Sequence, residues 1–211
     1  MTKNNSILVG TIATAPKEFT LKNGKVFYEA IVEVERLSGA KDKIPVHFQR
    51  HMKDIVQQGN VVKINGNLRS RNEYVENYSR KRLLIYVYAL EIEQLTQEDL
   101  KNYETGNNIV ELECILVKKA ELRKTPLNKD IADCTIVFNR EYRKSDYFPC
   151  IAWKDEAEQI SEYEVGTHLD VEARIQSRDY IKKYEDGSEE QKTTIELSIL
   201  KVNIKEDLNN E

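Results

Sequence analysis

One order of strand-like segments occurs twice in this chain, and that repeat constrains the fold more than any other feature. The matching motifs are V-E-V-E-R at 32–36 with I-V-F-N-R at 136–140, I-P-V-H-F at 44–48 with F-P-C-I-A-W at 148–153, and N-L-R-S-R-N-E-Y at 67–74 with R-I-Q-S-R-D-Y at 174–180. A period this long is one structural unit written twice, so the sequence predicts two domains.

Each copy contains short runs of β-branched and aromatic residues whose alternation is typical of half-buried strands. The predicted strands are 6–12, 19–21 with 26–34, 44–48, 61–68 and 83–95 in the first copy, and 109–117, 131–138, 147–153, 169–175 and 193–204 in the second. Asn23-Gly24 is a strong hairpin signal inside the first set. Residues 49–58 and 154–163 carry apolar residues at helical spacing, and Gly59 and Gly166 follow as stops.

Five strands with a short helix between the third and fourth is the order of the OB-fold, a small Greek-key barrel that binds oligonucleotides or oligosaccharides. We therefore expect an all-β protein of two tandem OB-folds, which are five-stranded Greek-key barrels, each with that helix. The expected division is a first domain at 1–96, a linker at 97–107, a second domain at 108–205 and a short C-terminal tail at 206–211. The linker is predicted because this segment has weak periodicity and contains Gly106.

Charge does not exclude a nucleic-acid partner. The formal net charge is −4, yet residues 1–103 hold 16 Lys and Arg against 12 Asp and Glu, whereas residues 104–211 hold 16 against 24. A binding face requires local positive potential, which a negative total permits. No apolar run is long enough for a membrane span and no secretory signal is evident, so we expect a cytoplasmic protein.

No pattern in the sequence predicts catalysis, a cofactor or a metal. We find no phosphate-cradling glycine loop, no G-x-S-x-G and no nucleophile with an evident base. His47 and His51 are four residues apart but lack a third ligand nearby. The three cysteines form no C-x-x-C pair, and we expect them to be small buried apolar residues.

A basic, aromatic bend joins two predicted strands of the second copy. Arg140, Tyr142, Arg143, Lys144 and Tyr147 cluster between the runs 131–138 and 147–153, and Trp153, the single tryptophan, closes the second run. Cations that meet phosphates and rings that stack on bases suit a surface for single-stranded nucleic acid. The alternative is an ordinary hairpin with a buried Trp153 and a solvated turn, in which Arg140 pairs with an acid such as Asp133.

The second copy resembles the bacterial single-stranded DNA-binding (SSB) protein family, in the tandem two-domain version found in Firmicutes. The resemblance is carried by R-K-T-P-L-N-K-D-I-A-D at 123–133, F-N-R-E-Y-R-K-S-D-Y-F-P-C-I-A-W at 138–153 and R-I-Q-S-R-D-Y at 174–180, and the first copy repeats the skeleton more loosely. It implies sequence-tolerant binding of single-stranded DNA in replication, recombination or repair. It also implies a homodimer, because typical members collect four OB domains.

The resemblance also suggests which residues bind DNA. It places base-stacking rings at Trp153, six residues earlier at Tyr147, and in the pairs Arg178–Tyr180 and Arg71–Tyr74, with Phe48 as the weaker counterpart of Trp153. The full predicted set is Tyr147, Trp153, Tyr180, Tyr184, Arg140, Arg143, Lys144, Arg178, Lys182 and Lys183 in the second copy, and Phe48, Arg69, Arg71, Tyr74, Tyr78 and Arg80 in the first.

Two features depart from the family pattern. The chain ends in E-D-L-N-N-E without the long flexible tail and acidic-aromatic tip through which typical members recruit replication and repair enzymes. Replication proteins stay open as partners, but recruitment by that route is in doubt. The first copy also lacks a tryptophan. The alternatives are an OB-fold scaffold for protein–protein contacts in a primosome-like or mobile-element assembly, or a binder of RNA or oligosaccharide.

Overall fold

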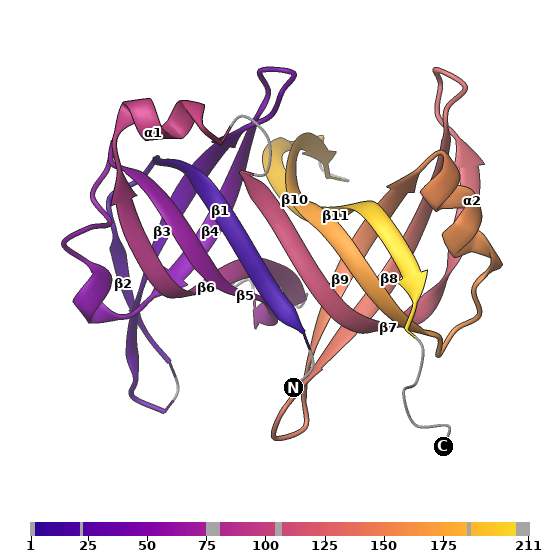
Figure 1. Cartoon of the computed structure of the whole chain (residues 1–211), viewed down its shortest axis with the longest axis horizontal. Coiled ribbons are helices and arrows are strands. Elements are labelled where there is room, and N and C mark those ends of the chain that lie inside the picture. The colour runs from indigo at the N-terminus through magenta and orange to yellow at the C-terminus, as the bar shows by residue number, and fades with distance from the viewer. Residues whose placement is uncertain (1–2, 22, 75–80, 104–106, 185–186, 206–211) are drawn as a thin grey trace.

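The computed structural model describes residues 3–21, 23–74, 81–103, 107–184 and 187–205, which form two barrels side by side (Figure 1). The first contains β1 (Asn4–Ile12), β2 (Lys17–Thr20), β3 (Val26–Glu35), β4 (Lys41–Phe48), the 3₁₀ turn η1 (Arg50–Met52), β5 (Val61–Tyr74) and β6 (Lys81–Leu95). The second contains β7 (Asn108–Lys124), β8 (Asp130–Arg140), β9 (Lys144–Trp153), α2 (Asp155–Glu162), β10 (His168–Lys183) and β11 (Glu189–Ile204). The helix α1 (Gln97–Lys101) stands between the two sets.

Both barrels close in the same way. In the first, β1 pairs with β3 and β5, β3 with β4, and β6 runs parallel to β4. In the second, β7 pairs with β8 and β10, β8 with β9, and β11 runs parallel to β9. Alternate residues such as Leu8, Val32, Leu112 and Ile136 point inward and are fully buried. The prediction of an all-β OB architecture is confirmed.

Local sequence explains where the two copies differ. Pro16 lies between β1 and β2, whereas residues 108–124 contain no proline and form the single strand β7, with register shifts near Lys118. The helix predicted at 154–163 is α2. At 49–58 the prediction of a helix is wrong, because only the short η1 turn forms there. No helix among the described residues is long and apolar enough to span a membrane.

Strand register aligns the two copies residue by residue. Pro45 lies opposite Ile31, as Pro149 lies opposite Thr135. Counting along the same strands, Phe48 lies opposite Tyr28 and its equivalent is Ala152, which lies opposite Ala132. Trp153 is one residue further along, so its equivalent in the first barrel is Gln49.

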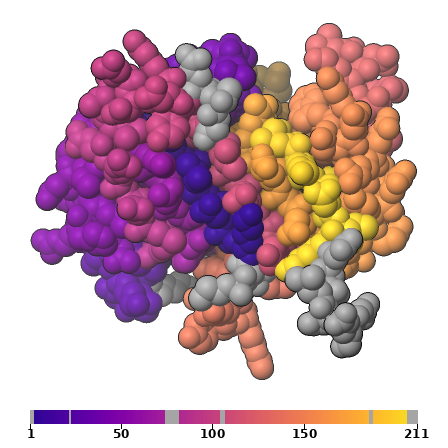
Figure 2. All heavy atoms as spheres, in the orientation of Figure 1, coloured from indigo at the N-terminus to yellow at the C-terminus, as the bar shows by residue number. Residues whose placement is uncertain are grey.

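The two barrels are joined by β1 and β7, which pair antiparallel so that Asn4 lies opposite Leu112 and Leu8 opposite Asn108. Asn4 and Asn108 are equivalent residues, which makes this seam nearly two-fold symmetric. Each of these amides also bonds both backbone groups of one residue in its own barrel, Leu68 for Asn4 and Ile175 for Asn108, at 2.7–2.9 Å. In the space-filling view β1, in indigo, fills the seam between the two halves (Figure 2).

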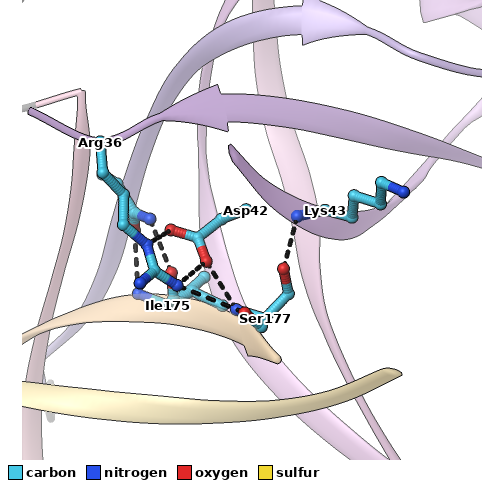
Figure 3. A network of polar contacts seen from close by, with 6 residues as sticks. Arg36, Asp42, Lys43, Ile175 and Ser177 are labelled. Carbon is cyan, nitrogen blue, oxygen red and sulfur yellow. Dashed lines mark hydrogen bonds and ion pairs between the residues drawn. The ribbon is translucent and has the colours of Figure 1, made fainter. Parts of the chain in front are cut away.

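A buried carboxylate reinforces the seam at each end. At one end, Asp42 pairs with Arg36 of its own hairpin at 2.5 Å and accepts the backbone N–H of Ser177 from the other barrel at 2.7 Å (Figure 3). The N–H of Lys43 donates to the Ser177 hydroxyl at 2.8 Å (Figure 3). The β3–β4 hairpin of the first barrel therefore holds β10 of the second.

The other end repeats this clasp with the roles of the barrels exchanged. Asp146 pairs with Arg140 at 2.8 Å and accepts the backbone N–H of Ser70 at 2.7 Å, and the N–H of Tyr147 donates to the Ser70 hydroxyl at 2.9 Å. Asp146 is fully buried, and burial raises the pKa of its carboxyl, although the Ser70 N–H and the Arg140 charge oppose that shift. We call the Asp42 and Asp146 networks the two clasps.

Candidate nucleic-acid interface

Two tyrosines of the second barrel expose much of their rings. Tyr147 on β9 is 49% exposed and Tyr180 on β10 is 40% exposed, whereas Phe148, beside Tyr147, is fully buried. This contrast follows from the pleat, which sends successive side chains to opposite faces. Trp153 ends β9 half-buried, opposite Ile131. Of Tyr147, Trp153 and Tyr180, which are predicted to stack on bases, the two tyrosines are therefore accessible.

The predicted cations of the second barrel divide into exposed and engaged groups. Arg143, Lys144 and Arg178 are exposed. In the β10–β11 hairpin, Lys183 pairs with Glu189 at 2.9 Å, and the Lys182 ammonium lies 4.9 Å from the centre of the Tyr184 ring.

The hydroxyl of Tyr184 donates to Glu190. Acidic neighbours therefore already offset part of the positive charge of this hairpin.

Arg140 occupies a structural position. Its guanidinium is bound to the buried Asp146 carboxylate of the clasp. Asp133, the acid considered for it from the sequence, pairs with Arg123 at 2.5 Å. Because the Arg140 charge balances a buried acid, it contributes less free positive charge to a phosphate than its place in the basic bend indicated.

The prediction that Phe48 stacks on a base is wrong. Its side chain is fully buried in the core, where its ring stacks on Tyr28 at a centroid distance of 5.9 Å. The register shows why: Phe48 is equivalent to the buried Ala152, and the exposed Gln49 is equivalent to Trp153. A shift of one residue moves a side chain to the other face of a strand.

The first barrel has rings that the sequence reading missed. Phe19, Phe27, Tyr86 and Tyr88 lie on one face of the sheet with His47, whose ring stacks on Tyr86 at 3.9 Å and approaches Phe19 at 4.8 Å. Alternation was the available signal for the tyrosines, because Tyr86 and Tyr88 alternate with the buried Ile85, Val87 and Ala89.

Two predicted arginines lie on these rings. The Arg69 guanidinium is 4.1 Å from the Tyr88 ring centre, and that of Arg71 is 5.1 Å from the Phe19 ring centre. Burial and the charge of Arg140 lower the pKa of Arg69. Cations placed over rings in this way are held by the quadrupole of the ring. The Arg71 guanidinium is also paired with Glu73 at 2.5 Å.

His47 is the buried member of this face, and its Nε2 is 2.7 Å from a carboxylate oxygen of Glu29. Burial lowers the pKa of His47, although Glu29 opposes that shift. The hydrogen bond from His47 in turn lowers the pKa of Glu29. These directions are consistent with a neutral imidazole that donates to an ionised carboxylate.

The two barrels carry their rings at complementary positions. By register, the equivalents of Tyr147, Trp153 and Tyr180 in the first barrel are Lys43, Gln49 and Glu73. The equivalents of Phe19, Phe27, Tyr86 and Tyr88 in the second are Arg123, Ile131, Glu196 and Ser198. Each barrel is therefore aromatic where the other is not.

Some predicted residues lie outside this description. Tyr78 and Arg80, and the side chain of Tyr74, fall outside the described residues.

A groove of about 600 Å³ at the seam is bordered by Arg69, Arg140 and Lys144 and by the exposed Tyr142. Within the described ranges no group of three His, Cys, Asp or Glu side chains is placed to hold a metal ion.

Comparison with known proteins relates the second barrel to a family. Residues 107–204 match the model of the single-strand binding protein family. The curated relatives include Single-stranded DNA-binding protein 3 of Streptococcus agalactiae, 35% identical over 81 residues that cover 35% of this chain and 58% of the relative. The Single-stranded DNA-binding protein of Streptococcus mutans is 35% identical over 81 residues and is covered to 49%. The chain thus spans about half the length of the curated relatives it matches.

A solved structure relates both barrels to one fold. The single-stranded DNA binding protein of Thermus aquaticus superposes with a TM-score of 0.77 at 18% sequence identity, covering 100% of this chain and 96% of the other. At this identity the similarity establishes the fold. The second barrel is therefore similar to the single-strand binding protein family, and both barrels share the fold of the Thermus aquaticus protein.

Proposed function

We propose that this protein binds single-stranded DNA with little sequence preference, by stacking bases on exposed rings and neutralising phosphates with nearby cations. The observation that carries the proposal is the exposure of Tyr147 and Tyr180, together with that of Lys144 and Arg178 on the same two strands, on the barrel that matches the single-strand binding family. We further propose that residues 1–96 and 108–205 act as two OB domains, and that two chains associate to supply four barrels.

The energetics of this arrangement suit a sequence-tolerant binder. A base stacked on an aromatic side chain contributes about 1–3 kcal/mol, and every base offers a flat face. Each phosphate contact adds a term that weakens with salt, because condensed counterions are released on binding. Tyrosine suits the role because its ring stacks while its hydroxyl stays hydrated.

Titration with oligo-dT tests the proposal, and Trp153 is its reporter because it is the single tryptophan of the chain. We expect quenching of Trp153 emission, a rise in anisotropy of a labelled oligo-dT, and weaker binding at higher salt. Competition by oligo-rU and duplex DNA ranks the substrates. Absence of any complex at low salt refutes the proposal, and preference for oligo-rU replaces DNA with RNA. Light scattering measures the number of chains per particle.

A further inference from the structure

The geometry points to a second base-binding site, on the first barrel, in a groove walled by Phe27 and Tyr88. This inference rests on the proposed function and extends it to a face that the family match does not cover, since that match begins at residue 107. The ligand class is the same, namely the unpaired bases and phosphates of single-stranded DNA.

The groove has a volume of about 660 Å³. It is lined by Lys25, Val26, Phe27, Gln49, Arg50, His51 and Tyr88. This volume lies within the range of small-ligand sites. The two walls meet edge to face, with ring centres 6.0 Å apart and planes inclined at 66°. Gln49 donates from its amide to the Tyr88 hydroxyl at 2.8 Å, which fixes the position of that ring.

Comparison with the second barrel explains why this space is open. There Trp153 takes the place of Gln49, while Ile131 and Ser198 take the places of Phe27 and Tyr88. Ser198 is only 1% exposed. The second barrel thus supplies one large ring from the end of its third strand. The first supplies two rings from other strands and has the smaller, exposed Gln49 at the position of Trp153.

The charges around the groove match an anionic chain. Lys25 and Arg50 are exposed at its edge, His51 is exposed beside them, and none of the residues that line it is acidic. Tyr88 also contacts Arg69, whose guanidinium lies 4.1 Å from its ring centre and which borders the groove at the seam. Rings and cations therefore continue from this groove toward the second barrel.

The test uses variants that remove the rings while keeping an apolar side chain. Phe27→Leu with Tyr88→Leu is compared with Tyr147→Leu and Tyr180→Leu in the second barrel, and with Tyr163→Leu, a ring outside both faces, as the control. Anisotropy of a labelled oligo-dT long enough to contact both barrels measures affinity. We expect the first-barrel variant to weaken binding by about 5- to 150-fold, the equivalent of one lost stack of about 1–3 kcal/mol, and the control to bind as wild type.

Two further variants keep the test decisive if the double variant folds poorly. Arg50→Glu changes an exposed charge at the groove and is expected to weaken binding several-fold, whereas Lys201→Glu on β11 is its charge-matched control. Tyr88→Trp in a Trp153→Phe chain places the sole tryptophan in the groove, where it serves as a groove reporter, and oligo-dT is expected to quench it.

The outcomes separate the two proposals. One outcome overturns the groove as a DNA-binding site and leaves the proposed function standing. In that outcome wild type binds and the second-barrel variants lose affinity, but the Phe27/Tyr88 and Arg50 variants bind like their controls and the emission of the groove reporter stays constant. If wild type forms no complex, both are overturned. Loss of affinity in the first-barrel variants, with quenching of the groove reporter, supports the site.

Discussion

Removal of one clasp carboxylate by Asp146→Ala is expected to destabilise the whole protein by about 3 kcal/mol. The carboxylate is fully buried and accepts the Ser70 N–H at 2.7 Å from the opposite barrel. Losing it leaves that amide without its acceptor, which costs about 1–3 kcal/mol. It also removes a charged hydrogen bond to Arg140, worth about 1.5–3 kcal/mol, of which part is regained because the Arg140 side chain is 25% exposed and can be hydrated.

The matched control is Asp133→Ala. Asp133 pairs with Arg123 at a short distance of 2.5 Å, but both side chains are exposed, by 42% and 53%. An exposed pair contributes about 0–1 kcal/mol. Asp42→Ala removes the mirror clasp and is expected to behave like Asp146→Ala.

Urea unfolding provides the measurement, followed by circular dichroism for both barrels and by Trp153 emission for the second. We expect the midpoint of Asp146→Ala to fall well below that of Asp133→Ala. We also expect the two signals to separate, because the seam loses one of its two carboxylate clasps. An Asp146→Ala midpoint equal to that of Asp133→Ala would refute the reasoning that burial and the cross-barrel bond give this carboxylate its weight.

Three further predictions follow from the same structure. Phe48→Ala should cost about 3–5 kcal/mol in the free energy of unfolding through a core cavity, measured by urea unfolding; a variant as stable as wild type that loses only DNA affinity would contradict the burial of Phe48. Because burial lowers the pKa of His47, this residue takes up a proton in the unfolded chain before it does so in the folded one, and the free energy of unfolding should decrease as pH falls through about 6.5, by at most about 1.4 kcal/mol per pH unit. His47→Leu should flatten this dependence of the unfolding free energy on pH. A variant with an unchanged pH dependence would exclude His47 as its source. The double replacement of Lys144 and Arg178 by Ser should reduce the slope of log affinity against log salt concentration by about 1.4, if each residue contacts one phosphate of a single strand. A slope equal to that of the control Lys201→Ser would show that neither residue contacts a phosphate.

Much of the fold was predictable because its signals are local. Alternation between apolar and polar residues depends only on the pleat of each strand, so nearly every strand lies where its pattern indicated. The repeat seen in the sequence is also present in the strand register, since Pro45 and Pro149 occupy equivalent positions opposite Ile31 and Thr135. The helix at 49–58 was overpredicted because three apolar residues at helical spacing do not outweigh the turn that the barrel closure imposes there.

The candidate site was predictable only in part. Tyr147 and Tyr180 stand in polar surroundings with alternating neighbours, so their exposure followed from the pattern. Phe48 was misassigned because a motif match tolerated a shift of one residue, which in a strand exchanges the core face for the solvent face. Phe19 and Phe27 gave no signal of a surface shared with Tyr86 and Tyr88. Phe27 meets Tyr88, and Phe19 meets His47, only across strands that are distant in the chain.

The sequence by itself determined the repeat, the strand order and the OB class, because these depend on residue pattern within short segments. Only the tertiary structure decided which charges are free and which rings share a face. Arg140 and Arg178 look alike in the sequence, yet Arg140 is bound to a buried carboxylate in a clasp to the other barrel, and Arg178 is exposed. That difference arises because ion pairing and burial depend on residues that the closed barrels and their shared seam bring together.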